Sequence, residues 1–196
     1  EVDSRGVDIV LAMDCSQSMV VERMGLRTRM DVALETARDF VRGRPHDRLG
    51  VVGFSGVAYT MCPLTLDHAT LLELLAGAQD RQATDGTAIG MGLATAVQRL
   101  RDSRSPSKVV VLLTDGENNR GAIDPLTAAE LAKAMGVKVY TVLVGQQSAV
   151  MADGGDVVTP LVSIADRTGG RFFSAGDAAA GSPDPPTPRH VSTLNW

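Results

Sequence analysis

The sequence is poor in several features that would point to common functional classes. Aromatic residues make up only 4% of the 196 residues, so the core has to be built mainly from Val, Leu, Ile, Ala and Met. No apolar run approaches the roughly 18 residues that a membrane-spanning helix needs, and no signal peptide is recognisable. The formal net charge is −4 and no basic run occurs, so a nucleic acid is not expected as a partner. The remaining composition, 44% hydrophobic and 21% charged, is that of a globular domain.

Cysteine and histidine are equally scarce. The two cysteines, Cys15 and Cys62, each stand where a predicted strand gives way to a loop, and the question of a disulfide between them stays open. Neither belongs to a CxxC or Cys/His pattern, so no zinc site is predicted. The three histidines fall at predicted helix ends or in the C-terminal tail, which leaves a serine nucleophile without an obvious base.

Short apolar runs alternate with segments of helical periodicity along most of the chain. Strands are expected at 7–13, 49–54, 57–61, 109–113, 137–144 and 171–174, and helices at 29–42, 87–100, 125–135, 161–168 and after Asp67. This alternation favours an α/β fold with a mostly parallel sheet and right-handed crossovers. Residues 19–28 are expected to form an irregular connection, and Pro63 is expected to end the edge strand.

Composition divides the chain into three parts. The polar residues 1–6 are expected to be a loose N-terminal end. Residues 7–180 form the predicted domain. Prolines crowd the chain after residue 181, so 181–196 are predicted to be an extended linker or a tail added for expression.

The richest chemistry follows the first predicted strand. Asp14, Ser16 and Ser18 place oxygen side chains at alternate positions of the loop that leaves it. In an open α/β sheet this carboxyl edge is where ligands bind, and a carboxylate with two hydroxyls suits a hard cation such as Mg²⁺. Asp and Ser are also ordinary turn and capping residues, so this loop taken alone fits a polar turn equally well.

Two later segments add oxygen side chains at comparable places. Thr87 follows Asp85-Gly86 at the start of a helical stretch, and Asp115 follows the apolar strand 109–113 within Thr114-Asp115-Gly116. Asp-x-Ser-x-Ser, a Thr in a Gly-rich turn and Thr-Asp-Gly after a strand, in this order, resemble the metal-ion-dependent adhesion site of the von Willebrand factor A (VWA, or integrin I-domain) family. The resemblance runs from about residue 7 to about residue 175.

The segments between these motifs resemble bacterial VWA proteins of the aerotolerance (Bat) type. The similar stretches are 48–65, 85–90, 112–119 with 123–125, and 168–173. Such relatives are usually membrane-anchored and often encoded beside AAA+ ATPases of the MoxR type. The resemblance therefore implies that this chain is the soluble, extracytoplasmic (periplasmic) domain of a membrane-anchored protein. Cys15 and Met91 depart from the residues usual in the family, but neither departure removes a metal ligand.

The VWA resemblance implies both a fold and a metal site. The fold is a Rossmann-like, doubly wound, mostly parallel six-stranded sheet of order 3-2-1-4-5-6, with only strand three antiparallel and helices on both faces. A divalent cation, Mg²⁺ or alternatively Mn²⁺ or Ca²⁺, is expected at five residues: Asp14, Ser16, Ser18, Thr87 and Asp115. The two serines are the expected direct ligands, Thr87 is a conditional one, and the two carboxylates are expected to act through water.

The function implied by this site is adhesion-type protein binding. Hydroxyl ligands leave much of the cation's charge uncancelled, which favours an Asp or Glu of a partner protein as a further ligand. The candidate partner contacts are Gln17, Met19, Asn118 and Asn119, although ordinary solvated loop chemistry explains them equally well. The alternative function is docking onto a MoxR-type AAA+ ATPase as a subunit of a chaperone-like or metal-insertion complex.

Two other functions fit the sequence less well. An enzyme would use Ser16, Ser18 or Asp14 as a nucleophile, but no G-x-S-x-G, Walker A or H-E-x-x-H motif occurs. A dinucleotide site would need G-x-G-x-x-G after the first strand, where Asp-Cys-Ser-Gln-Ser stands instead. Neither catalysis nor dinucleotide binding is therefore predicted.

Overall fold

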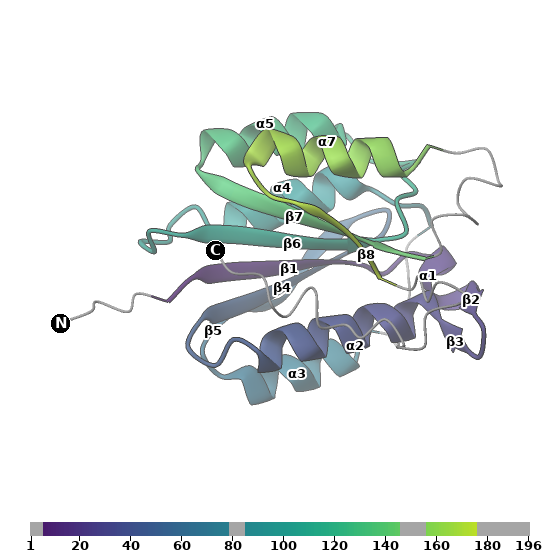
Figure 1. Ribbon diagram of the computed structural model, residues 1–196, viewed down its shortest axis with the longest axis horizontal. Helices are drawn as coiled ribbons and strands as arrows, with labels where there is room; N and C mark the ends of the chain where they lie inside the picture. Colours follow the sequence, from purple (N-terminus) through teal and green to yellow (C-terminus); the bar gives the residue numbers. More distant parts are fainter. Residues whose placement is uncertain (1–5, 79–84, 146–155, 176–196) are drawn as a thin grey trace, which may run out of the picture.

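One six-stranded sheet runs through the molecule (Figure 1). The computed structural model describes residues 6–78, 85–145 and 156–175. In chain order the strands of the sheet are β1 (Asp8–Asp14), β4 (Arg48–Phe54), β5 (Ala58–Thr65), β6 (Lys108–Thr114), β7 (Val137–Val144) and β8 (Phe172–Ala175). Their order across the sheet is β5-β4-β1-β6-β7-β8, and only β5 runs antiparallel to its neighbour. The predicted Rossmann-like strand order and directions are confirmed.

Helices cover both faces of the sheet, as Figure 1 shows. The helices α2 (Arg29–Arg42) and α3 (His68–Ala76) lie on one face, and α4 (Ile89–Arg99), α5 (Pro125–Ala134) and α7 (Val158–Thr168) lie on the other. The central strand β1 feeds both layers because successive side chains point to opposite faces. Leu11 and Met13 join the apolar cluster under α2, whereas Val10 and Ala12 join the cluster under α4.

Helix α2 shows how the sequence specifies these elements. Thr28 and Asp31 form a reciprocal capping box, in which each side chain accepts a hydrogen bond from the other residue's backbone N–H, at 3.1 and 2.8 Å. The apolar residues that repeat with helical spacing, among them Met30, Leu34 and Val41, are all buried. The predicted cap of α3 is also present, since Asp67 Oδ1 accepts a hydrogen bond from the Thr70 backbone N–H at 3.1 Å.

The region 19–28 differs from the irregular connection expected from the sequence. It holds the end of a short helix, α1 (Gln17–Val21), and an antiparallel hairpin of β2 (Arg23–Met24) and β3 (Arg27–Thr28). Such two-residue strands carry too few residues for an alternating pattern to be recognised.

Pro63 does not end the edge strand, as was expected, because β5 continues to Thr65. The pairing with β4 shifts register between Leu49↔Thr65 and Val51↔Cys62, and Pro63 falls in this irregular stretch. A proline is tolerated there because an edge strand with a bulge does not need every N–H for its ladder.

Several element ends also differ from those expected. Helix α4 begins at Ile89, so Thr87 lies in the preceding loop. Helix α7 begins at Val158 instead of residue 161, because Pro160 is accommodated in its first turn. Both cysteines are buried, and no disulfide joins them. In the described part of the chain no helix is both long and apolar enough to cross a membrane. The predicted tail, 181–196, lies outside the described residues.

The close approach of α4 to the segment before α5 yields a test of this packing. A Cβ placed on Gly90 would lie 2.0 Å from the Ile123 carbonyl oxygen. We expect Gly90→Ala to lower the free energy of unfolding by about 1–3 kcal/mol or more, because backbone must move to admit the methyl group. Urea unfolding measures the change. Gly77→Ala is the matched control, since its nearest neighbour would be the Leu74 carbonyl oxygen at 3.6 Å. Equal stability of the two variants would contradict the packing described here.

Candidate metal centre

The candidate site lies where two neighbouring parallel strands end. Strands β1 and β6 pair in register up to Met13↔Leu113, so Asp14 and Thr114 reach the same edge of the sheet. The segments that follow therefore start side by side, and they carry Ser16, Ser18 (in the first turn of α1) and Asp115. This is the carboxyl edge, where open α/β sheets bind their ligands.

Asp14 forms the floor of the site and is completely buried. Its Oδ1 accepts a hydrogen bond from the Ser16 backbone N–H at 2.9 Å, and its Oδ2 accepts one from the Thr114 hydroxyl at 2.6 Å. Burial, and secondarily the charge of Asp115, raise the pKa of the Asp14 carboxyl from 3.8 to about 7. A cation nearby would therefore stabilise the ionised form of Asp14.

Next to Asp14, hydrogen bonds connect the side-chain oxygen atoms of Ser16, Ser18 and Asp115 in series. The two serine Oγ atoms lie 3.1 Å apart, and Ser18 Oγ donates a hydrogen bond to Asp115 Oδ2 at 2.5 Å. The other carboxylate oxygen, Asp115 Oδ1, accepts from the Glu117 backbone N–H at 3.2 Å. Ser16 and Asp115 are almost completely buried, and Ser18 is half-buried. The structure thus brings three of the predicted residues into side-chain contact and links the fourth, Asp14, to them through the Ser16 backbone.

Thr87, the fifth predicted residue, is buried in the loop before α4. Its backbone N–H donates to Asn119 Oδ1 at 2.8 Å, and its carbonyl oxygen accepts from the Asn119 backbone N–H at 3.1 Å. Within the described residues its hydroxyl makes no hydrogen bond to the other four. The loop after β6 therefore fixes Thr87 through its backbone.

The four candidate partner contacts take different positions. Gln17 is exposed, between Ser16 and Ser18 in the sequence, and its role as a partner contact stays a prediction. Met19 differs from the expectation, because its side chain is fully buried in the core and offers no surface. Asn118 and Asn119 are exposed residues whose amide oxygens accept hydrogen bonds from the backbone N–H groups of Ile89 and Thr87. Their structural role is to brace the Thr87 loop against the loop of Asp115.

Two residues of the site were missed by the sequence analysis. Thr114 holds Asp14 with its hydroxyl, and its place at the end of an apolar strand beside Asp115 was the available signal. Arg29 Nη1 donates to Asp115 Oδ2 at 3.1 Å, and Nη2 pairs with Glu22 at 2.8 Å. Its side chain is only 12% exposed. No sequence pattern indicates that an arginine at the start of α2 reaches this loop.

The chemistry of this donor set is that of hard oxygen. Two carboxylates and three hydroxyls suit Mg²⁺, Mn²⁺ or Ca²⁺, and the buried carboxylate pair is the feature that a divalent cation would compensate. No group of three or more His, Cys, Asp or Glu residues in the described part of the chain could hold a metal ion by itself. A metal ion at this site would therefore need other oxygen ligands beside the two carboxylates, and the hydroxyls of Ser16 and Ser18 are the nearest of them. Of the histidines, His68 bonds instead to the Asp47 carbonyl oxygen at 2.9 Å, outside the site.

Comparison with known proteins places these features in a family. The family model of the von Willebrand factor type A domain matches residues 8–183. An uncharacterised protein of Borreliella burgdorferi is 30% identical over 188 residues, which cover 89% of this chain and 55% of that protein. This chain therefore spans about half the length of that relative.

Two solved structures extend the comparison. An aerotolerance-related membrane protein from Bacteroides fragilis superposes with a TM-score of 0.75 at 23% identity, covering 88% of this chain and 92% of that one. Proximal thread matrix protein 1 from the mussel byssus, with a zinc-occupied MIDAS motif, superposes with a TM-score of 0.69 at 25% identity, covering 91% and 44%. The first comparison supports the fold alone. Together with the match of the family model, the fold and the Asp-x-Ser-x-Ser loop identify this chain as a member of the von Willebrand factor type A domain family.

Proposed function

We propose that this domain binds a protein partner through a divalent cation, Mg²⁺ or alternatively Mn²⁺ or Ca²⁺. The cation would be held by Asp14, Ser16, Ser18, Thr87 and Asp115, and an Asp or Glu of the partner would complete its shell. The observation that carries this proposal is the contact of Ser16 with Ser18 and of Ser18 with Asp115, next to the buried carboxyl of Asp14, which accepts a hydrogen bond from the Ser16 backbone.

The roles of the residues follow from their positions. The hydroxyls of Ser16 and Ser18 are neutral ligands, with Thr87 as a conditional third, whereas Asp14 and Asp115 hold water around the ion. When bound, the cation would supply a positive charge that attracts a carboxylate from solvent. Because the carboxylates act through water and the direct ligands are neutral hydroxyls, much of the ion's charge stays uncancelled on the side that faces an incoming acid. Arg29, already paired with Asp115, adds a positive charge beside the site.

We favour binding over catalysis for the same hydroxyl groups. Ser16 and Ser18 bond to each other and to Asp115, and no described histidine hydrogen-bonds to either of them. A serine nucleophile ordinarily depends on such a base.

We propose further that the full-length protein is membrane-anchored, with this domain outside the cytoplasm. The Bacteroides fragilis relative, described as a membrane protein, supports the anchor. The second candidate function, docking onto a MoxR-type AAA+ ATPase, rests on the Bat-type resemblance alone and stays a prediction.

Thermal unfolding in EDTA and in excess Mg²⁺ or Mn²⁺ tests the metal site. Binding to the native state adds about 2.7 kcal/mol at a hundredfold excess over Kd, which raises Tm by roughly 5–10 °C for a domain of this size. We expect Asp14→Asn to lose this rise while it keeps or gains stability in EDTA at pH 8, because the amide removes a buried charge.

Asp102→Asn is the matched control, because that carboxylate is 86% exposed at its side chain and belongs to no site loop. It should keep the full rise in Tm. A metal-dependent rise that persists in Asp14→Asn would contradict the proposed coordination.

The raised pKa of Asp14 predicts that rising pH lowers the stability of the metal-free domain and increases its affinity for the metal. Between 3.8, the ordinary value, and about 7, the folded metal-free domain holds a proton that the unfolded chain has released. Its stability should therefore fall as pH rises across this window. Metal affinity should change in the other direction, since the ion displaces that proton, with Kd weakening about tenfold per pH unit below 7.

Titration calorimetry at pH 5.5, 6.5 and 8 measures the metal affinity, and urea unfolding in EDTA at the same pH values measures the stability. Asp14→Asn should remove the pH-dependent step in EDTA. A parent domain whose metal affinity is independent of pH would contradict this assignment.

A further inference from the structure

The hairpin that follows the segment of Asp14, Ser16 and Ser18 exposes an apolar side chain to solvent. Strands β2 and β3 pair through Arg23↔Thr28 and Met24↔Arg27, and the turn between them is Gly25-Leu26. Gly25 has a φ of +66°, in the left-handed region that glycine adopts most easily. Leu26 is 95% exposed. A leucine at a hairpin tip gains nothing from folding when it stands so far from the core.

This tip is held in place by contacts at its base. The Arg29 backbone N–H donates to the Glu22 carbonyl oxygen at 3.1 Å, and the two side chains form an ion pair at 2.8 Å. Arg27 pairs with Glu35 of α2 at 2.7 Å. The hairpin is therefore fixed to α2, and its two ends are joined through Glu22 and Arg29.

Two further apolar side chains are exposed directly before the hairpin. On α1, Val20 is 42% exposed and Val21 is 64% exposed. With Arg23 and Leu26 they form what we call the hairpin patch. Elsewhere in the described residues the exposed large apolar side chains are single ones on separate segments: Val57, Leu66 and Leu131. Exposed apolar residues concentrated in one segment mark an interaction surface more often than scattered ones do.

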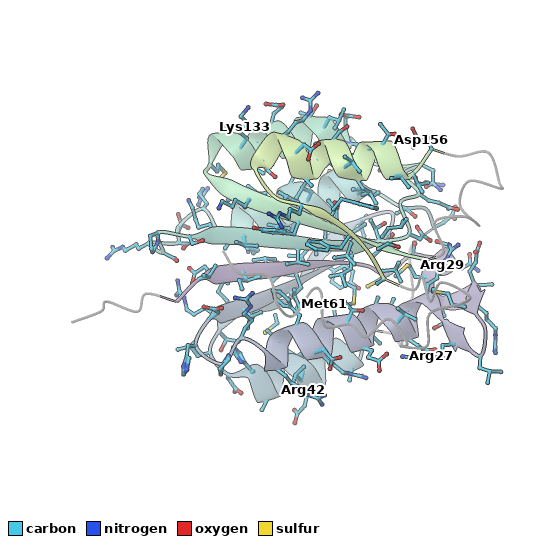
Figure 2. The ribbon with its side chains drawn as sticks, in the orientation of Figure 1. Arg27, Arg29, Arg42, Met61, Lys133 and Asp156 are labelled. Atoms are coloured by element: carbon cyan, nitrogen blue, oxygen red, sulfur yellow. The ribbon has the colours of Figure 1, made fainter. Side chains whose placement is uncertain are left out.

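The hairpin patch lies at the same end of the molecule as the metal centre. Helix α1 contains Ser18, one of the candidate metal ligands, and Arg29 at the base of the hairpin contacts Asp115. Figure 1 shows α1, β2 and β3 together at this end, and Figure 2 shows Arg27 and Arg29 on the same side. A partner seated on the metal would therefore meet the hairpin.

The charges on the two sides of the candidate metal centre indicate on which side an acidic partner would bind. Residues 19–29 contain three arginines and one glutamate, although the whole chain has a net charge of −4. Arg27 is paired with Glu35, and Arg29 is paired with both Glu22 and Asp115. Arg23 is therefore the positive charge that this segment offers to a partner. No described carboxylate pairs with Arg23. The other side of the site is acidic, since a cavity of about 390 Å³ between the loop after β6 and helices α5 and α7 is lined by Glu117, Asp124 and Asp156 among apolar residues. An acidic partner is attracted to the hairpin side and repelled from the cavity.

We infer that the hairpin patch is a second contact surface for the protein partner. The partner segment that reaches it carries apolar side chains for Val20, Val21 and Leu26 and an Asp or Glu for Arg23, next to the carboxylate that binds the metal. This inference rests on the proposed metal-dependent binding and specifies the chemistry of that partner.

A display selection of random 16-residue peptides on the Mg²⁺-loaded domain tests the inference. The variants are Leu26→Ser and Arg23→Glu. The controls are Leu66→Ser and Arg104→Glu, two exposed residues that line a hollow beside Asp8, at the opposite ends of the strands. Selected peptides should combine acidic with apolar residues. Their Kd should rise at least tenfold in each hairpin variant and stay within twofold in each control, while the Mg²⁺-induced rise in Tm is unchanged in all four.

The outcomes separate the inference from the proposed function. Peptides that bind Asp14→Asn as well as the parent would overturn the metal-dependent function itself. Peptides lost in Asp14→Asn but unaffected by both hairpin variants would leave that function standing and overturn the role of the hairpin. A selection that yields no peptide sensitive to both hairpin variants also overturns it.

Two further measurements test other occupants of the hairpin patch. Co-sedimentation with phosphatidylcholine vesicles, with and without phosphatidylglycerol, should show no binding that Leu26→Ser removes. Sedimentation velocity should show no self-association that Leu26→Ser removes. Leucine-dependent binding to vesicles would assign the patch to a lipid surface, and leucine-dependent dimers would assign it to a second copy of this chain. Either result overturns the inference.

Discussion

The electrostatic cost of holding Asp14 and Asp115 together is the constraint on which this site depends. Asp14 is fully buried, and Asp115 is nearly so at the end of the neighbouring strand. Burial and mutual repulsion both disfavour two ionised carboxylates, which is why the pKa of Asp14 rises to about 7. The protein offsets part of this cost with hydrogen bonds from Thr114 and Ser18 and with the guanidinium of Arg29. A divalent cation would offset the remainder.

The surrounding structure holds the oxygen atoms in position before any ion arrives. Parallel pairing of β1 with β6 brings Asp14 and Thr114 to one edge, and the capping of α2 sets the position of Arg29. Asn118 and Asn119 tie the loop after β6 to the start of α4 by side-chain to backbone hydrogen bonds. The paired strands, the capped helix and the hydrogen bonds between loops favour a preformed site over one that must fold around the metal.

The two sides of the candidate metal centre differ in charge. Arg23 and exposed aliphatic side chains follow the first loop, whereas three carboxylates line the hollow beside the loop after β6 among apolar residues. A cation alone would accept a carboxylate from many proteins. The asymmetry around it would distinguish partners by the residues that flank that carboxylate, and unfavourable contacts on the acidic side would exclude some of them.

The sequence by itself determined the alternation of strands and helices and the oxygen side chains of the loops, because these depend on local patterns. The strand order and the full set of five candidate ligands came from the resemblance to the von Willebrand factor A family. Apolar runs such as 109–113 are short and bounded, and Asp14, Ser16 and Ser18 keep a fixed spacing after one of them. The tertiary structure alone decided that Met19 is buried, that Asn118 and Asn119 brace a neighbouring loop, and that Arg29 reaches Asp115. It also decided that residues 23–28 form a hairpin. Each of these features depends on contacts between distant segments or on strands too short to carry a period, so no local pattern records it.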